Sequence, residues 1–321
     1  MAPRCPRILA HLGAIDVTVA GAWRASQPVS VEPVAHRRGF TLRFSRLAPD
    51  TCADSYNGTM GKHAGSQLMK DGWVPDQHGS WAMAFLPLVA GLIINPVQPS
   101  SWLLVVAWTA GFFLFAVGEK YLKFRFKPRY LPALLTYLAI TVVAGLALVI
   151  VHPQLLWWAP VFAPLVAISA HRAWRRRERE LTSRVVAIVA AALMVPVTAS
   201  LARSQPWFTR PWDTHSWLLA MLIAAYFIST VPYVKTLIRE RRSQAWLVGS
   251  ILTHLALWAL IAALAVSGWV GWPHLVVWSL IFVRAVAMPL VARRRGRPWR
   301  PREIGIPEVV LTVLVALTLP W

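Results

Sequence analysis

A short segment near residue 120 alternates cationic and apolar side chains. Residues 118–130 read Gly-Glu-Lys-Tyr-Leu-Lys-Phe-Arg-Phe-Lys-Pro-Arg-Tyr. In an extended conformation, Lys123, Arg125 and Lys127 would share one side, whereas a helix would lie at a membrane surface with its cations reaching toward water. Both arrangements suit a phosphate or an anionic headgroup, and the alternative is a basic loop that touches lipid phosphate nonspecifically. The candidate ligand-binding residues of this segment are Glu119, Lys120, Tyr121, Lys123, Arg125 and Arg129.

A second basic segment follows a long apolar run and reads Tyr-Val-Lys-Thr-Leu-Ile-Arg over residues 233–239. Lys235 and Arg239 are four residues apart and would share one face of a helix. Pro232, just before them, would kink that helix and free a backbone carbonyl. We expect Tyr233, Lys235 and Arg239 to be ligand-binding candidates at the inner membrane surface, and the alternative is a solvated helix end.

A third segment, residues 75–83, combines a histidine with residues that suit the start of a helix. Gly79 permits a tight turn, and Ser80 can cap the first free N–H groups. Trp81 suits the headgroup level of a bilayer, and His78 can bind an anion or transfer a proton at neutral pH. The alternative is that this string only caps and anchors the helix, with His78 in water.

The third segment, P-x-x-H-G-S-W-A-M leading into an apolar helix with Pro87 one turn later, resembles the YwiC-like family of bacterial membrane proteins. The resemblance extends from residue 72 to the end of the chain. It implies an integral membrane protein and assigns no activity.

Ionisable residues also lie inside apolar runs. Arg284 is about eight residues from the basic end of its run, and a cation at that depth requires a partner. Glu308 and Glu119 are the available carboxylates, so the sequence predicts an Arg284–Glu308 or Arg284–Glu119 ion pair with a structural role. His254 lies near the middle of another run, and we expect a neutral, hydrogen-bonded core histidine rather than a proton relay.

The apolar runs predict an all-α, polytopic transmembrane bundle of about nine helices. A membrane helix needs about 20 apolar residues to cross the bilayer core, and only 14% of this chain is charged. Tryptophan at the chain end would be an interfacial anchor. The predicted helices are 80–95, 100–118, 131–151, 154–171, 183–201, 216–237, 245–267, 272–292 and 304–320.

The distribution of Lys and Arg predicts the orientation. The loops after the second, fourth, sixth and eighth predicted helices carry 21 basic residues, and the alternate loops carry only Arg203 and Arg210. Basic loops stay in the cytoplasm, so the N-terminus would be inside and the C-terminus outside. Because the basic residues cluster in these loops, the net charge of +20 indicates membrane orientation and not nucleic-acid binding. We therefore expect a multi-pass protein of the inner (cytoplasmic) membrane.

Residues 1–68 differ from the rest of the chain, since they contain both cysteines and no sustained periodicity. They are expected to be a disordered tail or the result of a misplaced start, with translation beginning at Met69. Residues 69–321 form the predicted transmembrane domain. Arg outnumbers Lys 27 to 6, which suggests a GC-rich bacterial genome.

Nine helices with special segments after the second and sixth also resemble the architecture of UbiA-type prenyltransferases. That resemblance implies Asp-rich motifs that hold magnesium and a prenyl diphosphate. Here the only Asp after Asp76 is Asp213, in an outer loop, and the two exits are basic. Magnesium prefers carboxylate oxygens, so the sequence predicts no metal site and no cofactor.

Three functions remain open at this stage. The first is a binding or transport-like protein that takes an anionic or phosphorylated lipid, or a small anion, at the cytoplasmic face. The second is a prenyltransferase-like enzyme with a phosphate site that lacks Asp. The third is an accessory or assembly protein without a small-molecule site. The absence of an evident nucleophile–base or acid pair favours the first and third, and the sequence predicts no oligomeric state.

Overall fold

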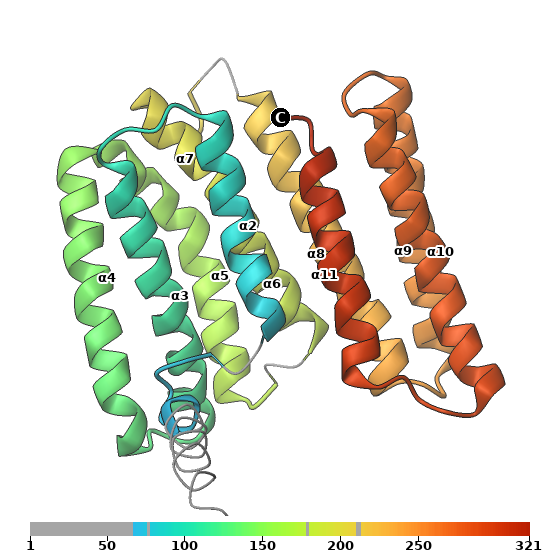
Figure 1. Ribbon diagram of the computed structural model, residues 1–321. Coiled ribbons are helices and arrows are strands. Elements are labelled where there is room, and N and C mark those ends of the chain that lie inside the picture. Colours follow the sequence, from blue (N-terminus) through green and yellow to red (C-terminus); the bar gives the residue numbers. More distant parts are fainter. Residues whose placement is uncertain (1–66, 76–77, 178–179, 210–212) are drawn as a thin grey trace, which may run out of the picture. The chain divides into compact units, whose positions relative to one another are not determined.

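The computed structural model describes residues 67–321, apart from residues 76–77, 178–179 and 210–212 (Figure 1). This part of the chain is helical and contains no strand, which confirms the predicted all-α class. The predicted tail, residues 1–68, lies outside the described residues except for its last two, which are helical.

All nine predicted segments coincide with helix. Two short 3-10 helices, η1 (Pro128–Tyr130) and η2 (Pro153–Trp158), precede α4 and α5. The α-helices are α2 (His78–Ile94), α3 (Ser101–Lys123), α4 (Leu131–Val151), α5 (Ala159–Trp174), α6 (Leu181–Ala192), α7 (Met194–Arg203), α8 (Thr214–Ile238), α9 (Gln244–Val266), α10 (Trp272–Arg295) and α11 (Pro301–Thr318).

The segment predicted as one helix over 183–201 is divided. Helix α6 ends at Ala192 and α7 begins at Met194. Pro196 has no N–H to donate to the carbonyl of Ala192, so the regular bonding pattern is interrupted at this point. The two helices still continue in one direction, because the N–H of Val197 bonds to the carbonyl of Leu193 at 3.0 Å.

Seven helical segments within the described residues are long and apolar enough to cross a membrane. They contain 22 to 25 residues, which corresponds to roughly 33–38 Å of helix. Helix α2 is apolar but shorter, and α11 includes Arg302, Glu303 and Glu308. The chain is thus a polytopic helical membrane protein, and the number of crossings and their orientation stay predictions.

The outer faces of the helices are apolar. Val143 and Ile150 of α4 are 69% and 79% exposed, and Val266 of α9 is 76% exposed. Such a surface is stable in lipid, because apolar side chains that face hydrocarbon do not need to be buried within the protein. Helix α8 is the opposite case: Leu219, Ile223 and other large side chains along it are fully buried between its neighbours.

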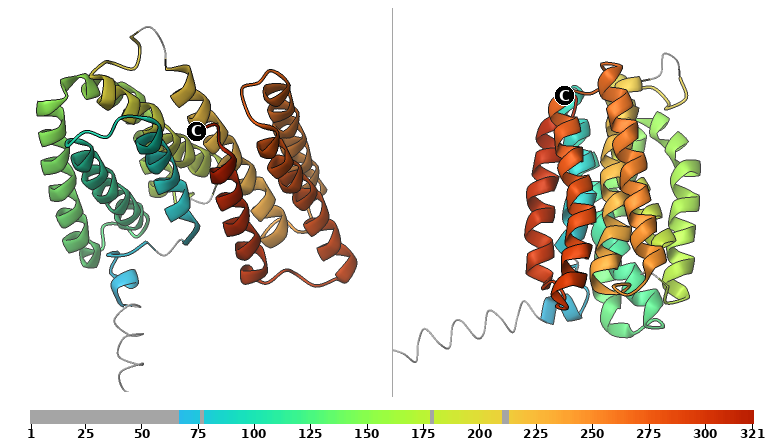
Figure 2. Two further views of the ribbon diagram at one scale, coloured as in Figure 1. Left: turned by 45° about the horizontal axis from the view of Figure 1, so that its top comes forward. Right: turned by 90° about the vertical axis from the view of Figure 1, so that its right-hand side faces the viewer.

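The helices alternate in direction, so the loops after α3, α5, α8 and α10 lie together at one end of the described bundle (Figure 1). We call this the basic end, because these are the four loops rich in Lys and Arg. The C-terminus lies at the opposite end. Helices α9 and α10 form a hairpin beside α8, and the three views agree on this arrangement (Figure 2).

Candidate functional site

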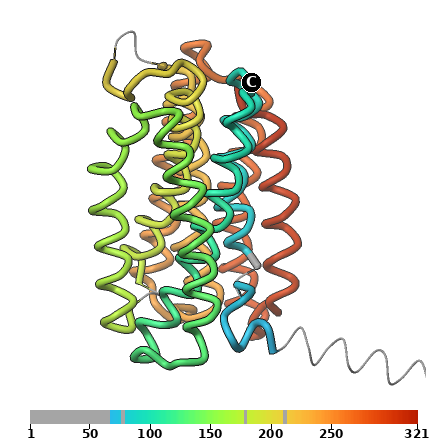
Figure 3. Tube along the Cα trace, turned by 90° about the vertical axis from the view of Figure 1, so that its left-hand side faces the viewer, coloured from blue at the N-terminus to red at the C-terminus, as the bar shows by residue number. Residues whose placement is uncertain are grey.

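The first basic segment is a helix end followed by a tight turn. Helix α3 continues to Lys123, five residues beyond its predicted end, so the extended alternative for residues 118–130 is wrong. The N–H of Phe126 bonds to the carbonyl of Tyr121 at 2.8 Å, and that of Arg125 to Leu122 at 3.2 Å. This is the bonding pattern of a Schellman motif. Figure 3 shows the turn at the basic end.

Aromatic rings hold the cations of this turn. The guanidinium of Arg125 lies 4.6 Å from the ring centre of Trp174 at the end of α5, and Phe126 packs against the same ring. The guanidinium of Arg129 lies 4.6 Å from the ring of Tyr130 and also bonds to its hydroxyl. Such contacts stabilise a cation near a membrane surface. The turn is therefore a packed platform in which part of the charge is already engaged.

The remaining candidates near this turn have structural contacts. The Lys120 ammonium donates to the Met69 carbonyl at 3.1 Å, and the Lys123 ammonium lies 5.5 Å from the ring of Phe124. Glu119 lies within the last turns of α3, and Tyr121 packs edge-on against Phe126.

The residues of the third segment begin helix α2. His78 is the first residue of α2, and its side chain lies outside the described residues. Ser80 is the third helical residue, so its expected position as a cap is wrong. Trp81 packs against Phe85, Phe112 and Phe113 with ring centres 5.3 to 5.8 Å apart. Trp81 thus joins α2 to α3 through aromatic packing.

A cavity opens at the basic end between α8 and α10. It encloses about 540 Å³. Arginines dominate the charged side chains around it, since five of the six are Arg and one is Glu, for a formal charge of +4. The lining residues are Thr236, Arg239, Glu240, Arg241, Arg242, Ser243, Pro289, Ala292, Arg293, Gly296, Arg297 and Pro298.

Three of these arginines help to build the walls. Arg293 donates to the side chain of Gln244 at 2.9 Å and to the carbonyl of Ser243 at 3.2 Å, which joins the end of α10 to the start of α9. Arg241 donates to the carbonyl of Ile238, and Arg297 pairs with Glu303 at 3.3 Å. The side chains of Arg239 and Arg242 line the cavity, are exposed, and make no hydrogen bond or ion pair with another described residue, so their guanidinium donors are free.

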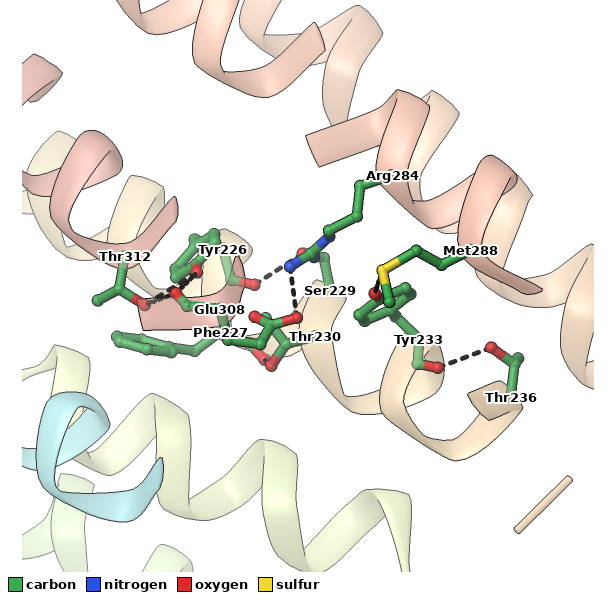
Figure 4. Close-up of polar contacts among 10 residues, drawn as sticks. All are labelled: Tyr226, Phe227, Ser229, Thr230, Tyr233, Thr236, Arg284, Met288, Glu308 and Thr312. Atoms are coloured by element: carbon green, nitrogen blue, oxygen red, sulfur yellow. Dashed lines mark hydrogen bonds and ion pairs between the residues drawn. The ribbon is translucent and has the colours of Figure 1, made fainter. Parts of the chain in front are cut away.

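A polar cluster joins α8, α10 and α11 (Figure 4). Arg284 of α10 reaches Glu308 of α11 and forms an ion pair, with side chains only 8% and 20% exposed. Its guanidinium also lies 4.1 Å from the ring centre of Tyr233 on α8. The carboxylate placed against Arg284 is thus that of Glu308, and not that of Glu119.

Two tyrosines connect this cluster to its surroundings. The hydroxyl of Tyr226 lies 2.9 Å from that of Thr312 and donates to the carbonyl of Glu308 at 3.2 Å. The hydroxyl of Tyr233 donates to the sulfur of Met288 at 2.8 Å. His254 lies edge-on to Tyr233, and its Nδ1 is 2.7 Å from the carbonyl of Ser250.

Residues 74–199 match the model of a family described as YwiC-like protein. Over this range the chain is similar to the YwiC-like family. This match agrees with the resemblance predicted from the segment at residues 75–83. A Bacillus subtilis (strain 168) protein named "Uncharacterized protein YwiC" is 28% identical over 248 residues, which are 74% of this chain and 92% of the relative. A Haemophilus influenzae protein named "Uncharacterized protein" is 28% identical over 187 residues, or 57% and 74%. No solved structure matches the chain significantly.

The YwiC-like range contains the first and third predicted segments, and the cavity and the buried cluster follow it. The alignment with the Bacillus subtilis protein covers 74% of this chain, which is more than all residues up to 199, where the family match ends. The alignment therefore also includes part of the helices after α7. Within the described residues, no group of three His, Cys, Asp or Glu side chains could hold a metal ion.

Besides His78 and Trp81 in the first turn of α2, the structure divides the predicted ligand-binding residues between two places. One group surrounds the turn after α3, and the second consists of Lys235 and Arg239 at the end of α8, with Tyr233 one turn deeper. Lys235 lies 4.4 Å from the ring centre of Trp246. The cavity adds Arg241, Arg242, Arg293 and Arg297 to the second group. From the sequence, these four residues predicted only the orientation in the membrane. The sequence feature that could have indicated these arginines is the short connection between α8 and α9. This connection brings the end of α8 close to the end of α10 when α9 and α10 pair.

Proposed function

We propose that this YwiC-like membrane protein binds an anionic group, a lipid phosphate or a small anion, in the cavity between α8 and α10. The observation that carries the proposal is the ring of five arginines around about 540 Å³ of space. We further propose that the protein resides in the inner membrane and that the basic end faces the cytoplasm, because Lys and Arg are retained on that side.

The donors of the cavity suit an oxyanion. A guanidinium is planar and always charged, and it presents pairs of N–H groups that match the oxygens of a phosphate or carboxylate. Arg239 and Arg242 have such groups available, and the three wall-building arginines add to the positive potential. Since the cavity lies where α8 and α10 end, a lipid headgroup and a soluble anion can both reach it.

The turn after α3 is proposed as a second contact with the membrane surface. Its cations lie on aromatic rings, and this combination is common at the level of lipid headgroups. Lys120, Lys123, Arg125 and Arg129 would attract anionic lipid there, whereas His78 at the start of α2 is proposed as a polar gate on the same side.

Lipid retention tests the proposal. The full-length protein is extracted in mild detergent, the lipids that copurify are identified by mass spectrometry, and binding of inorganic phosphate is measured on the same sample. A cation near a membrane surface contributes about 1 kcal/mol to binding of anionic lipid. Arg239→Gln/Arg242→Gln should therefore reduce retention or phosphate affinity about 30-fold.

Two further variants make this experiment specific. Arg175→Gln/Arg176→Gln removes the same charge at the end of α5, outside the cavity, and should retain the ligand. Lys123→Ala/Arg125→Ala tests the turn after α3 and should reduce retention of lipid but not the affinity for phosphate. Bulk lipid alone, together with no phosphate binding by the wild-type protein, would contradict the proposal and favour the accessory function.

A further inference from the structure

The guanidinium of Arg284 has one edge that the protein leaves without a partner. Nη1 bonds to Glu308, but Nε and Nη2 are buried and have no hydrogen-bond partner among the described residues. These two nitrogens lie on the same edge of the planar group. Two parallel N–H donors on one edge are the arrangement that binds two oxygens of a carboxylate at once.

A buried cation with unused donors is costly inside a membrane protein. Each unsatisfied buried donor loses its hydration without replacement, and arginine is expensive in an apolar environment even when paired. The neighbouring Nε2 of His254 and the hydroxyl of Ser250 are also buried without a partner. The Arg284 and His254 side chains both contact the ring of Tyr233. Nδ1 of His254 donates to the Ser250 carbonyl, so the free Nε2 of the neutral ring is an acceptor. The unmet donors of Arg284 on α10 and the unmet acceptor of His254 on α9 thus belong to two side chains that contact the same tyrosine.

The α8–α10 cavity is the candidate route from the basic end to this region. Thr236 and Pro289 line the cavity, and they are three residues and one residue from Tyr233 and Met288, which form a hydrogen bond with each other. Figure 4 shows Tyr233 and Met288 beside Arg284, with Thr236, which lines the cavity, farther along α8. Opening of the Tyr233–Met288 contact would expose the free edge of the guanidinium to the cavity.

Prolines make the surrounding helices easier to deform. Pro232 precedes Tyr233 in α8, Pro289 follows Met288 in α10, and Pro307 precedes Glu308 in α11. A proline within a helix removes one hydrogen bond and bends the axis. Interrupted helices next to a polar site near the middle of the bilayer are typical of proteins that move small solutes.

We propose that the free edge of Arg284 binds a carboxylate that enters through the α8–α10 cavity, and that Glu308 takes up one proton as the carboxylate binds. The ligand carboxylate then replaces the Glu308 carboxylate as the counter-ion of Arg284. The charge of the site is conserved, because one anion and one proton arrive together. The inference rests on the proposed function only for the access route, and the buried site is separate from the cavity arginines.

The other titratable groups around the pair are Tyr226 and Tyr233 on α8 and His254 on α9. Both tyrosines are neutral near pH 7 in their ordinary form, so they do not supply the compensating charge. His254 is the alternative acceptor of the proton, and the experiment therefore includes a variant of it.

Proton uptake measured together with ligand binding tests the proposal. The full-length protein is placed in phosphatidylcholine nanodiscs, acetate is added in weakly buffered solution at pH 7, and an indicator dye reports protons. The wild-type protein should take up about one proton for each acetate bound. Decanoate, whose chain inserts in the bilayer, replaces acetate in a second series, and tighter binding of decanoate would identify a lipid-like carboxylate as the ligand rather than a soluble one.

Variants distinguish the buried site from the cavity. Glu308→Gln should bind acetate without proton uptake, and His254→Gln should bind with normal uptake. Arg284→Gln/Glu308→Gln keeps the cluster neutral and foldable, and it should weaken acetate binding at least tenfold. Arg239→Gln/Arg242→Gln tests the proposed function, and this variant should still take up one proton for each acetate bound. Absence of acetate binding in the wild-type protein, uptake retained in Glu308→Gln, or full binding in the double variant would overturn the inference.

Discussion

Arginine occupies two backbone positions in this protein that normally select glycine. Arg125 and Arg176 both have positive φ angles, 58° and 57°, at the ends of α3 and α5. A left-handed conformation costs an ordinary residue about 1–2 kcal/mol relative to the right-handed one. At Arg125 the stacking on Trp174 offsets part of this cost, but Arg176 is exposed and has no such contact among the described residues.

Arg176→Gly should therefore stabilise the protein. Glycine adopts the left-handed conformation without steric cost, although it adds entropy to the unfolded chain, so we expect a net gain of about 0.5–1 kcal/mol. Thermal unfolding in detergent measures it. Arg175→Gly, one residue earlier at φ −75°, should destabilise, and Arg125→Gly should gain little because it loses the ring contact. Equal effects of Arg175→Gly and Arg176→Gly would contradict this explanation.

At the scale of helices, α2 and α7 approach closely at a glycine. A Cβ atom added to Gly91 would lie 2.2 Å from the hydroxyl oxygen of Thr198. Asn95, the residue directly after α2, donates to the Gly91 carbonyl at 2.9 Å, and its side-chain nitrogen lies 3.4 Å from the same hydroxyl. Small residues allow such contacts between membrane helices, where packing and hydrogen bonds replace the hydrophobic effect.

Gly91→Ala should separate α2 from α7 and lower the thermal stability by about 1–3 kcal/mol, the usual cost of overpacking. Gly145→Ala and Gly249→Ala are matched controls in α4 and α9, because an added Cβ meets nothing within 4 Å at either site. Both should be neutral or stabilising, since alanine favours helix. A smaller loss for Gly91→Ala than for the controls would mean that the close approach is unimportant.

Some features of the fold and the site could be predicted from the sequence and others could not, because different physical interactions determine them. The length of apolar runs is set by bilayer thickness, so the predicted segments coincide with helix to within about five residues, although the segment 183–201 is divided into α6 and α7. The predicted end of α3 was wrong because helical bonding continues past Gly118 to Lys123, where Schellman bonds end the helix. Side-chain alternation does not report this backbone geometry. The cavity could not be predicted, since its arginines come from the α8–α9 connection, the end of α10 and the α10–α11 connection and meet only through packing.

At the scale of the whole molecule, orientation decides whether the cavity meets the cytoplasm. The basic end carries the loops after α3, α5, α8 and α10 (Figure 1), and the energetic preference of Lys and Arg for the inner side predicts that all four loops are cytoplasmic. The same preference requires that the connections after α7 and α9 are outside. A single measurement on both sets of loops therefore tests orientation and the alternation of the helices together.

Thiol labelling provides that measurement. In a Cys5→Ser/Cys52→Ser background, single cysteines are placed at Arg177 and Arg241 of the basic end and at Gln205 and Ser267 of the opposite end, all exposed positions. A membrane-impermeant maleimide added to intact cells should label only Gln205→Cys and Ser267→Cys, whereas permeabilised cells should label all four. Equal labelling in permeabilised cells is the control for reactivity. The reverse pattern would put the arginine cavity outside the cell, and an anion taken from the cytoplasm could then no longer be its ligand.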